Sequence, residues 1–181
     1  MAGDRIAIRV LESPLGPLRI AATQRGIVKL SFPHGPRTDF NAWLQARIGE
    51  AERVDDLPGL ACAVDQVRAY FDGSLRDFKV DLDLRGSSFQ VEVWRTLAEI
   101  PYGKTWTYAA VAERVGRPRA LRAVGAAAGA NPVPLILPCH RVTAAGGRLG
   151  GFGGGLDAKR RLLAFESQSL PLLSRSARSG V

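Results

Sequence analysis

Residues 131–142 read Asn-Pro-Val-Pro-Leu-Ile-Leu-Pro-Cys-His-Arg-Val, and they place one of the chain's two cysteines beside one of its two histidines. A thiol is a good nucleophile only as the thiolate, and an adjacent imidazole is a usual means of forming one near neutral pH. A single cysteine is more often a small buried apolar residue. Here prolines and an asparagine fix the preceding backbone, and His140 and Arg141 follow at once, which is a poor composition for a continuing core strand. We therefore interpret Cys139 as a candidate nucleophile.

The composition is that of a soluble globular protein with one ample core or two small domains. The chain has 181 residues, of which 46% are hydrophobic and 23% charged. The residues after Met1 lead into an alternating segment, so neither a signal peptide nor a membrane span is expected. Two cysteines argue against a disulfide framework and for a reducing cytoplasm. The cysteines and histidines also lack the paired spacing of zinc ligands, and we expect no metal and no cofactor.

The excess of positive charge lies in the second half of the chain. Residues 1–84 contain 11 Lys and Arg against 12 Asp and Glu, a net charge of −1, whereas residues 85–181 contain 14 against 5, a net charge of +9. An asymmetry of this size favours a polyanionic partner, because each neutralised phosphate releases condensed counterions. Ordinary solubility charge is the alternative explanation.

Periodicity in residues 1–84 predicts a small sheet with two helices. Three short strands, joined as an antiparallel meander, are expected at residues 6–10, 18–21 and 27–32. Helices are expected at residues 39–48 and 60–71. The strict alternation of residues 79–84 predicts a half-exposed strand. Cys62 lies off the apolar stripe of its helix and is interpreted as a packing or surface residue, so this half has no cluster of catalytic type.

Composition and charge change together near residues 85–87, where a domain boundary is predicted. Ser87 and Gln90 match a capping box, and a helix follows whose apolar stripe consists of Phe89, Val93, Leu97 and Ile100. A helix at residues 107–115, a turn at Gly116 and a helix that opens around Pro118 are typical of a helix-turn-helix unit. The remaining predictions are a glycine-rich loop, a helix and a flexible tail, at residues 146–155, 157–166 and 167–181.

The second helix of this unit has little side-chain bulk. Its apolar stripe consists of Leu121, Val124, Gly125 and Ala128, most of its other residues are alanine, and three arginines supply charge: Arg117, Arg119 and Arg122. Readers of the major groove carry long side chains along the helix, so a slim helix suits the narrower minor groove. Close packing on another helix is the alternative.

Four segments resemble the O6-alkylguanine-DNA alkyltransferases, also called methylated-DNA-protein-cysteine methyltransferases. They are Pro-Tyr-Gly at 101–103, Arg-Ala-Val-Gly at 122–125, Asn-Pro-Val-Pro at 131–134 and Ile-Leu-Pro-Cys-His-Arg-Val at 136–142. The resemblance is close over residues 89–166 and holds in outline before residue 85. It implies an α+β fold in which a small ribonuclease-H-like domain with an antiparallel sheet (1–84) precedes a mainly helical catalytic and DNA-binding domain with a helix-turn-helix (85–166) and a flexible tail (167–181).

The resemblance implies that Cys139 takes the alkyl group from O6 of guanine, and also from O4 of thymine, irreversibly and in a single turnover. The thiolate would come from a relay in which His140 acts through water and is oriented by Glu166, unless Glu166 is only a solvated carboxylate at a helix end. Asn131 would tie the turn that bears the cysteine to the recognition helix, unless it merely ends a helix before proline.

Further roles concern the leaving guanine and its pocket. The resemblance implies that Tyr108, unless it is a core aromatic, protonates the ring as a general acid and also contacts DNA by pressing on the neighbouring phosphate. It implies that Lys159 assists the Tyr108 hydroxyl. The carbonyls of Cys139 and Val142 would accept from the guanine amino group, and the amide of Gly153 would donate to O6. Some relatives carry tyrosine and serine where this chain has Phe152 and Gly153, so a hydroxyl donor is missing and the loop is predicted to admit bulkier alkyl groups.

The implied partner is double-stranded alkylated DNA, bound through the minor groove by a monomer, with cooperative assembly along the DNA left open. An alkylated base inside a duplex is out of reach, so the nucleotide must be flipped out. Arg122 would fill the vacated stack, while Ala123 and Gly125 would let the helix approach and Arg119 would contact DNA.

Three other functions compete as explanations of the same residues. Alkyltransferase-like binding proteins share the fold but have no reactive cysteine, which Cys139 argues against. A helix-turn-helix regulator would need a dimer interface and long recognition side chains, and neither is visible. A cysteine hydrolase would carry its histidine far from the cysteine in sequence.

Overall fold

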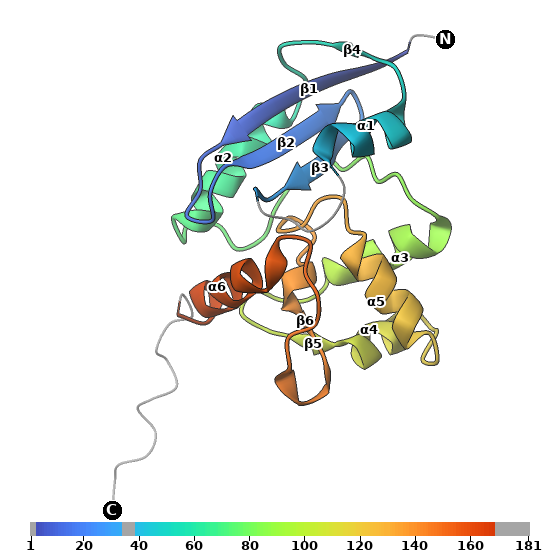
Figure 1. Ribbon diagram of the computed structural model, residues 1–181. Coiled ribbons are helices and arrows are strands. Elements are labelled where there is room, and N and C mark those ends of the chain that lie inside the picture. Colours follow the sequence, from blue (N-terminus) through green and yellow to red (C-terminus); the bar gives the residue numbers. More distant parts are fainter. Residues whose placement is uncertain (1–2, 34–38, 169–181) are drawn as a thin grey trace, which may run out of the picture.

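The N-terminal half of the molecule is built on a four-stranded sheet. The computed structural model describes residues 3–33 and 39–168. The strands are β1 (Asp4–Leu11), β2 (Leu18–Thr23), β3 (Gly26–Ser31) and β4 (Ala51–Arg53), in the spatial order β3-β2-β1-β4 (Figure 1). β1, β2 and β3 form the predicted antiparallel meander, whereas β4 was not predicted and pairs with β1 in parallel.

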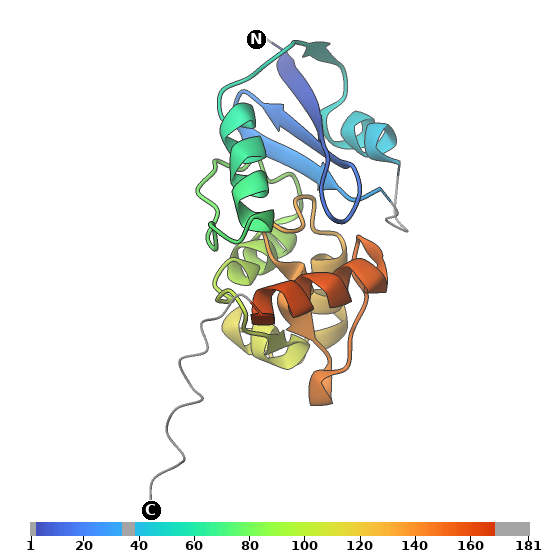
Figure 2. The same cartoon turned by 90° about the vertical axis from the view of Figure 1, so that its left-hand side faces the viewer.

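One helix covers each face of this sheet, α1 (Phe40–Ile48) on one side and α2 (Leu60–Phe71) on the other (Figure 2). Alternate side chains of β2 explain the arrangement, because Ile20 and Ala22 join the core under α2 and Ala21 joins the core under α1. Both helices end where the sequence predicts. Asp39 caps α1 by accepting hydrogen bonds from two backbone amides.

The C-terminal half consists mainly of helices. They are α3 (Ser88–Leu97), α4 (Tyr108–Arg114), α5 (Leu121–Gly129) and α6 (Gly155–Gln168), with two 3₁₀ turns (Cys139–Arg141 and Ala145–Gly147) and a short parallel pair of β5 (Trp106–Thr107) and β6 (Val142–Thr143). The predicted capping box of Ser87 and Gln90 is confirmed by both of its hydrogen bonds. α6 is two residues longer at each end than predicted, so the tail prediction began too early; residues 169–181 lie outside the described residues.

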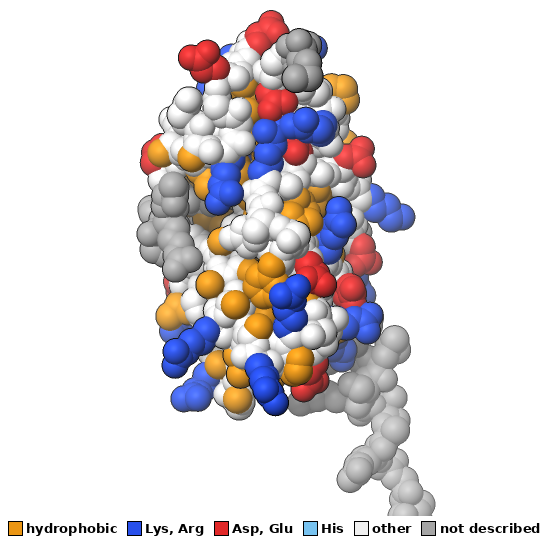
Figure 3. All heavy atoms as spheres, turned by 90° about the vertical axis from the view of Figure 1, so that its right-hand side faces the viewer, with side chains coloured by type: hydrophobic (Ala, Val, Ile, Leu, Met, Phe, Trp, Pro, Cys, Tyr) orange, Lys and Arg blue, Asp and Glu red, His pale blue; other side chains and the backbone are white. Residues whose placement is uncertain are grey.

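The predicted helix-turn-helix is α4 and α5, which contact each other. α5 begins at Leu121 and not around Pro118, because residues 118–119 form a turn. Leu121 is 46% exposed, so its predicted place in the apolar stripe is wrong, whereas Val124 and Ala128 are buried. Figure 3 views the side on which α3 and α5 lie and shows Lys and Arg side chains around its lower end, among small and apolar ones.

The two halves share one hydrophobic core and are joined by backbone contacts. Buried residues from Ala7 in β1 to Leu162 in α6 belong to the same cluster. The amide of Leu30 in β3 donates to the carbonyl of Pro132 at 2.9 Å, so the sheet is bonded directly to the turn that precedes Cys139. Within the described residues, no helix is long and apolar enough to cross a bilayer.

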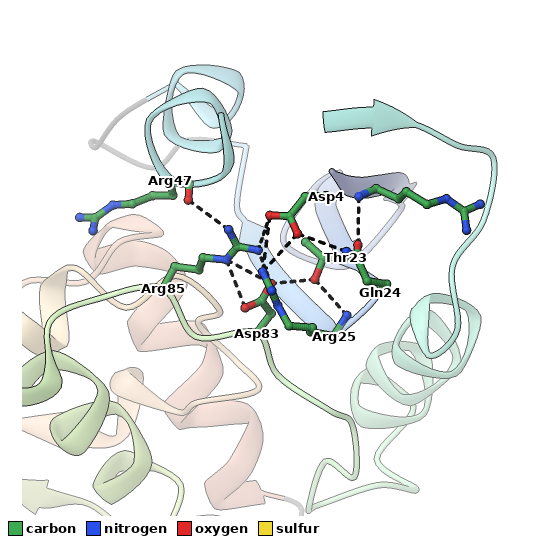
Figure 4. A network of polar contacts seen from close by, with 8 residues as sticks. Asp4, Thr23, Gln24, Arg25, Arg47, Asp83 and Arg85 are labelled. Atoms are coloured by element: carbon green, nitrogen blue, oxygen red, sulfur yellow. Dashed lines mark hydrogen bonds and ion pairs between the residues drawn. The ribbon is translucent and has the colours of Figure 1, made fainter. Parts of the chain in front are cut away.

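The strand predicted at residues 79–84 is wrong. Only Leu82 forms a bridge, with Ile27 of β3. The alternation has another cause, which is that Asp83 belongs to an ionic network (Figure 4). Its carboxylate accepts from Thr23 Oγ1 at 2.7 Å and from Arg85 Nη2 at 2.8 Å. Arg85 also pairs with Asp4 of β1 at 2.8 Å, which fixes the start of the C-terminal half to the sheet.

Candidate active site

A strained turn leads into Cys139. The Asn131 side chain holds this turn, because its Oδ1 accepts from the Val133 amide at 3.0 Å and its Nδ2 donates to the Leu137 carbonyl at 2.7 Å. Leu135 lies inside the turn with φ of 81° and is fully buried. A non-glycine residue in this region costs about 1–3 kcal/mol and persists only where its surroundings over-determine it. The residues that the sequence shows as an apolar run therefore form a rigid loop that places Cys139.

Cys139 begins the 3₁₀ turn and is only 6% exposed. Burial raises the pKa of its thiol to about 11, although the Asn131 amide and the Lys159 ammonium favour the thiolate. The expected thiolate is therefore not the resting state at neutral pH. A base must take the proton before the sulfur can react.

His140 can be that base. Its Nε2 atom is bonded to Glu166 and not to the thiol. Its ring is fully buried, and Nε2 lies 2.8 Å from Glu166 Oε1. Burial lowers the pKa of His140, against the opposing effect of Glu166, so the imidazole is neutral. Since an ionised carboxylate only accepts, Nε2 carries the proton and donates it to Glu166. Nδ1 then carries the lone pair, and it is buried without a hydrogen-bond partner among the described residues.

Glu166 is fully buried near the end of α6, so its interpretation as a solvated carboxylate is wrong. Besides His140 it accepts from the Arg141 Nε and Nη2 atoms, both at 2.9 Å, from the Gly103 amide at 3.0 Å and from the Tyr70 hydroxyl at 2.7 Å. Burial alone would raise the pKa of Glu166, but the hydrogen bonds from His140 and Arg141 lower it to about 2. The carboxylate is thus ionised and orients the imidazole.

Sequence reasoning missed three of these partners. Arg141 had a signal, since it stands beside His140 in the motif; its Nη1 also donates to the Ile100 carbonyl at 2.7 Å. Gly103 offers a backbone amide, which no side-chain pattern reveals. Tyr70 comes from α2 and lies 96 residues from Glu166, so nothing local in the sequence marks it.

Lys159 is bonded to backbone carbonyls. Its fully buried Nζ donates to the Val142 carbonyl at 2.6 Å and to the Gly150 carbonyl at 3.2 Å, and in the described part of the chain no hydrogen bond joins it to Tyr108. It therefore bonds the carbonyl of Val142 that was expected to accept from guanine. A carbonyl has two lone pairs, so both contacts are compatible.

Tyr108 is half-buried at the start of α4, between α5 and the glycine-rich loop. A Cβ at Gly150 would collide with its ring and hydroxyl, and one at Gly125 would touch the ring at 3.8 Å. Burial and the charge of an ionised Cys139 raise the pKa of Tyr108, so the phenol keeps its proton. The Tyr108 side chain is therefore the protonated phenol that a proton donor requires.

Of the predicted pocket residues, Phe152 lies next to His140. Phe152 is buried, with its ring centroid 6.2 Å from that of His140 and 5.5 Å from that of Phe32 at the end of the sheet. Gly153 has open space where a Cβ would stand, so the loop is wider here than a serine would leave it. No three acidic, histidine or cysteine side chains of the described residues come together to hold a metal ion.

The predicted DNA-contacting residues lie on one surface. Arg119, Arg122 and Ala123 are exposed on α5 or the turn before it, whereas Gly125 is half-buried against Tyr108. The opposite face of α5 packs on α3 and α4. Both explanations of the slim helix therefore apply, each to one face.

Two family descriptions match almost the whole chain. Residues 6–84 match the ribonuclease-like domain of 6-O-methylguanine DNA methyltransferase, and residues 88–168 match the DNA binding domain of that protein. The chain belongs to the 6-O-methylguanine DNA methyltransferase family. The family and the α+β fold with two parts are thus confirmed.

Relatives within this family share most of their length with the chain. The methylated-DNA–protein-cysteine methyltransferase of Mycolicibacterium paratuberculosis is 44% identical, over 92% of this chain and 95% of its own, and that of Methanosarcina barkeri is 40% identical, over 89% and 97%. Among solved structures, the Mycobacterium tuberculosis protein OGT in complex with DNA is 40% identical, with a TM-score of 0.77 over 93% of this chain and 96% of its own.

Proposed function

We propose that the protein repairs DNA by direct reversal, moving the alkyl group of O6-alkylguanine, and of O4-alkylthymine, onto Cys139. One observation carries this: a buried thiol directly precedes a buried neutral imidazole whose Nε2 is held by an ionised carboxylate and whose Nδ1 is open. Nucleophile, base and orienting group are thus present together. The names of the relatives, and the DNA bound to the Mycobacterium tuberculosis protein, support the same activity.

The reaction needs one proton relay and one displacement. The Cys139 thiol gives its proton through a water molecule to His140 Nδ1, and Glu166 stabilises the resulting imidazolium. The thiolate attacks the alkyl carbon, a C–S bond forms and the C–O6 bond breaks. Tyr108 donates a proton to the departing ring, a contribution of roughly 10²- to 10⁴-fold for a well-placed general acid.

The product is a thioether, so each molecule acts once. The second cysteine, Cys62, is exposed on α2 and bonded to Gln66, away from the relay. Nothing in the described site resolves a thioether. The two free thiols support work in a reducing compartment such as the cytoplasm.

DNA is engaged through the α5 surface in this proposal. The thiol is too deeply buried to meet a base inside a duplex, so the nucleotide is flipped out and Arg122 occupies its place. The small side chains Ala123 and Gly125 suit a minor groove, and the protein works as a monomer of two domains that divide near residue 85, with residues 167–181 as a tail.

Intact-mass analysis after mixing with alkylated duplex tests the proposal. We expect one alkyl mass per molecule on the peptide that contains Cys139, and no gain in Cys139→Ala. A non-catalytic binding protein of the same fold would retain binding without a mass gain, and that result would overturn transfer.

A further inference from the structure

Glu166 is held in part by the half of the molecule that carries no other member of the relay. Tyr70 lies near the end of α2, is fully buried, and donates its hydroxyl to Glu166 Oε1 at 2.7 Å. Figures 1 and 2 both show this end of α2 pointing toward the C-terminal half, above α6. The contact therefore joins the two halves at the carboxylate that orients His140.

Tyr70 and His140 share one carboxylate oxygen. Oε1 accepts from Tyr70 at 2.7 Å and from His140 Nε2 at 2.8 Å, and also from Arg141 Nη2 at 2.9 Å. Each donor withdraws negative charge from that oxygen, so the tyrosine weakens the pull of Glu166 on a proton held by His140. Without the hydroxyl, the imidazolium would be favoured more strongly.

The groups around the imidazole are three charged side chains, a neutral thiol and a neutral hydroxyl. Glu166 and Lys159 face it from α6, Arg141 and Cys139 from its own turn, and Tyr70 from α2. Arg141 donates to Glu166, and Lys159 donates to the carbonyls of Val142 and Gly150, so neither is held by Tyr70. A change at the Tyr70 hydroxyl thus alters one contact only.

The tyrosine ring is clamped by aromatic neighbours, which restrict where the hydroxyl can point. Phe78 stacks on it with ring centroids 5.6 Å apart, and Tyr102 meets it edge-on at 6.0 Å. Tyr102 is a natural control, because its hydroxyl is buried but has no hydrogen-bond partner among the described residues.

We propose that Tyr70 is a positioning residue of the relay, through which the sheet half keeps His140 a neutral base by sharing the charge of Glu166. The inference rests on the proposed function, since it assigns His140 the role of base. It gives the N-terminal half a part in the chemistry.

The test is the pH dependence of single-turnover alkyl transfer in Tyr70→Phe, which keeps the ring and removes one donor. The freer carboxylate raises the pKa of His140, and the relay needs neutral imidazole, so the acid limb moves to higher pH by about half to one unit. The rate then falls roughly 3- to 10-fold below the limb and less than about twofold above it. Tyr102→Phe should reproduce the native profile.

A second readout needs no alkyl transfer. Imidazole ¹⁵N shifts of His140, titrated in a Cys139→Ser, His34→Gln background that leaves one histidine, should show the same rise in Tyr70→Phe. In Glu166→Gln, the Tyr70→Phe change should not shift the titration of His140 further, because the amide that replaces the acceptor carboxylate has no negative charge to share.

Superimposable profiles and titrations for native protein and Tyr70→Phe would overturn the inference, as would a Tyr70→Phe protein that fails to fold while Tyr102→Phe folds. If the native protein transferred no alkyl group, the proposed function would fall, whereas the titration would still decide whether Tyr70 is coupled to His140.

Discussion

Within residues 3–33 and 39–168, two clusters of charged side chains are built around the carboxylates of Asp83 and Glu166, and the second also contains a histidine. Asp83 accepts from Thr23, Arg25 and Arg85, and its hydrogen bonds lower its pKa although burial opposes this (Figure 4). Glu166 accepts from Arg141, Tyr70 and a backbone amide in a similar way, but it also holds His140.

The two clusters differ in one titratable group, the His140 imidazole, whose Nδ1 atom has no hydrogen-bond partner among the described residues. Every donor around Asp83 is a hydroxyl or a guanidinium, so that network is closed and can only hold the linker to the sheet. Around Glu166 the imidazole has a free lone pair at Nδ1, beside a buried thiol. In the proposed function, this buried charge network serves catalysis because it ends in an imidazole that is neutral at physiological pH.

The largest expected effect comes from removing the sulfur. Cys139→Ser should abolish alkyl transfer, because a serine hydroxyl at this site has no base strong enough to ionise it, and intact-mass analysis with alkylated duplex measures this. Cys62→Ser, at the exposed cysteine on α2, is the matched control and should transfer normally. Residual transfer by the Cys139 variant would show that another nucleophile operates.

Exchanging each carboxylate for its amide tests the comparison itself. Glu166→Gln should slow single-turnover transfer by roughly 10²-fold, because the base loses its orienting charge. Asp83→Asn should leave the rate within about twofold and cost about 1–3 kcal/mol of stability, since it weakens only a structural network. Single-turnover assays quenched at successive times measure the rate of transfer, and chemical unfolding measures the stability. Equal loss of rate in both variants would remove the distinction between the clusters.

Acid stability should depend on Glu166. Its pKa is about 2 in the folded protein and about 4.5 ordinarily, so its contribution is present above about pH 4.5 and is lost as the pH falls toward 2. A shift of this size corresponds to about 3 kcal/mol. The free energy of unfolding of native protein should therefore drop more between pH 5 and 2 than that of Glu166→Gln. Parallel curves would mean that the carboxylate is not held as described.

The smallest effect among these substitutions is expected for Arg122, which lies outside both clusters. Arg122 is exposed on α5 and unlike Arg85 and Arg141 is available to DNA. Arg122→Ala should slow transfer from alkylated duplex about tenfold, because no side chain then occupies the place that the flipped nucleotide leaves in the base stack. Transfer from a free alkylated guanine base should be unchanged, which provides an internal control. Similar losses on both substrates would place Arg122 in the chemistry instead of in flipping.

The parts of this fold that follow from short-range rules could be read from the sequence. The caps at Asp39 and Ser87 and the glycine between α4 and α5 set helix bounds locally, and the motif at 131–142 marks Cys139 and His140. Residues 79–84 misled because the alternation is equally compatible with a strand and with an irregular segment in which the Asp83 carboxylate is tied to Arg85 and to the distant Arg25.

The site could be predicted only as far as the motif extends. The contact of Tyr70 with Glu166 spans 96 residues and depends on how α2 packs over α6, which no local pattern encodes. Lys159 was assigned to Tyr108 by resemblance, yet its ammonium bonds backbone carbonyls of Val142 and Gly150. The adjacent Cys139 and His140 could be predicted from the motif as candidate nucleophile and base, whereas the contacts that fix the charge state of His140 come from tertiary packing.

The most direct test of the account is to count lesions repaired per polypeptide. Native protein is mixed with a tenfold excess of duplex carrying O6-methylguanine, and unrepaired lesions are counted until the reaction stops. We expect that one lesion is cleared per molecule and that Cys139 is then fully alkylated. Continued clearance beyond one lesion per molecule would contradict it.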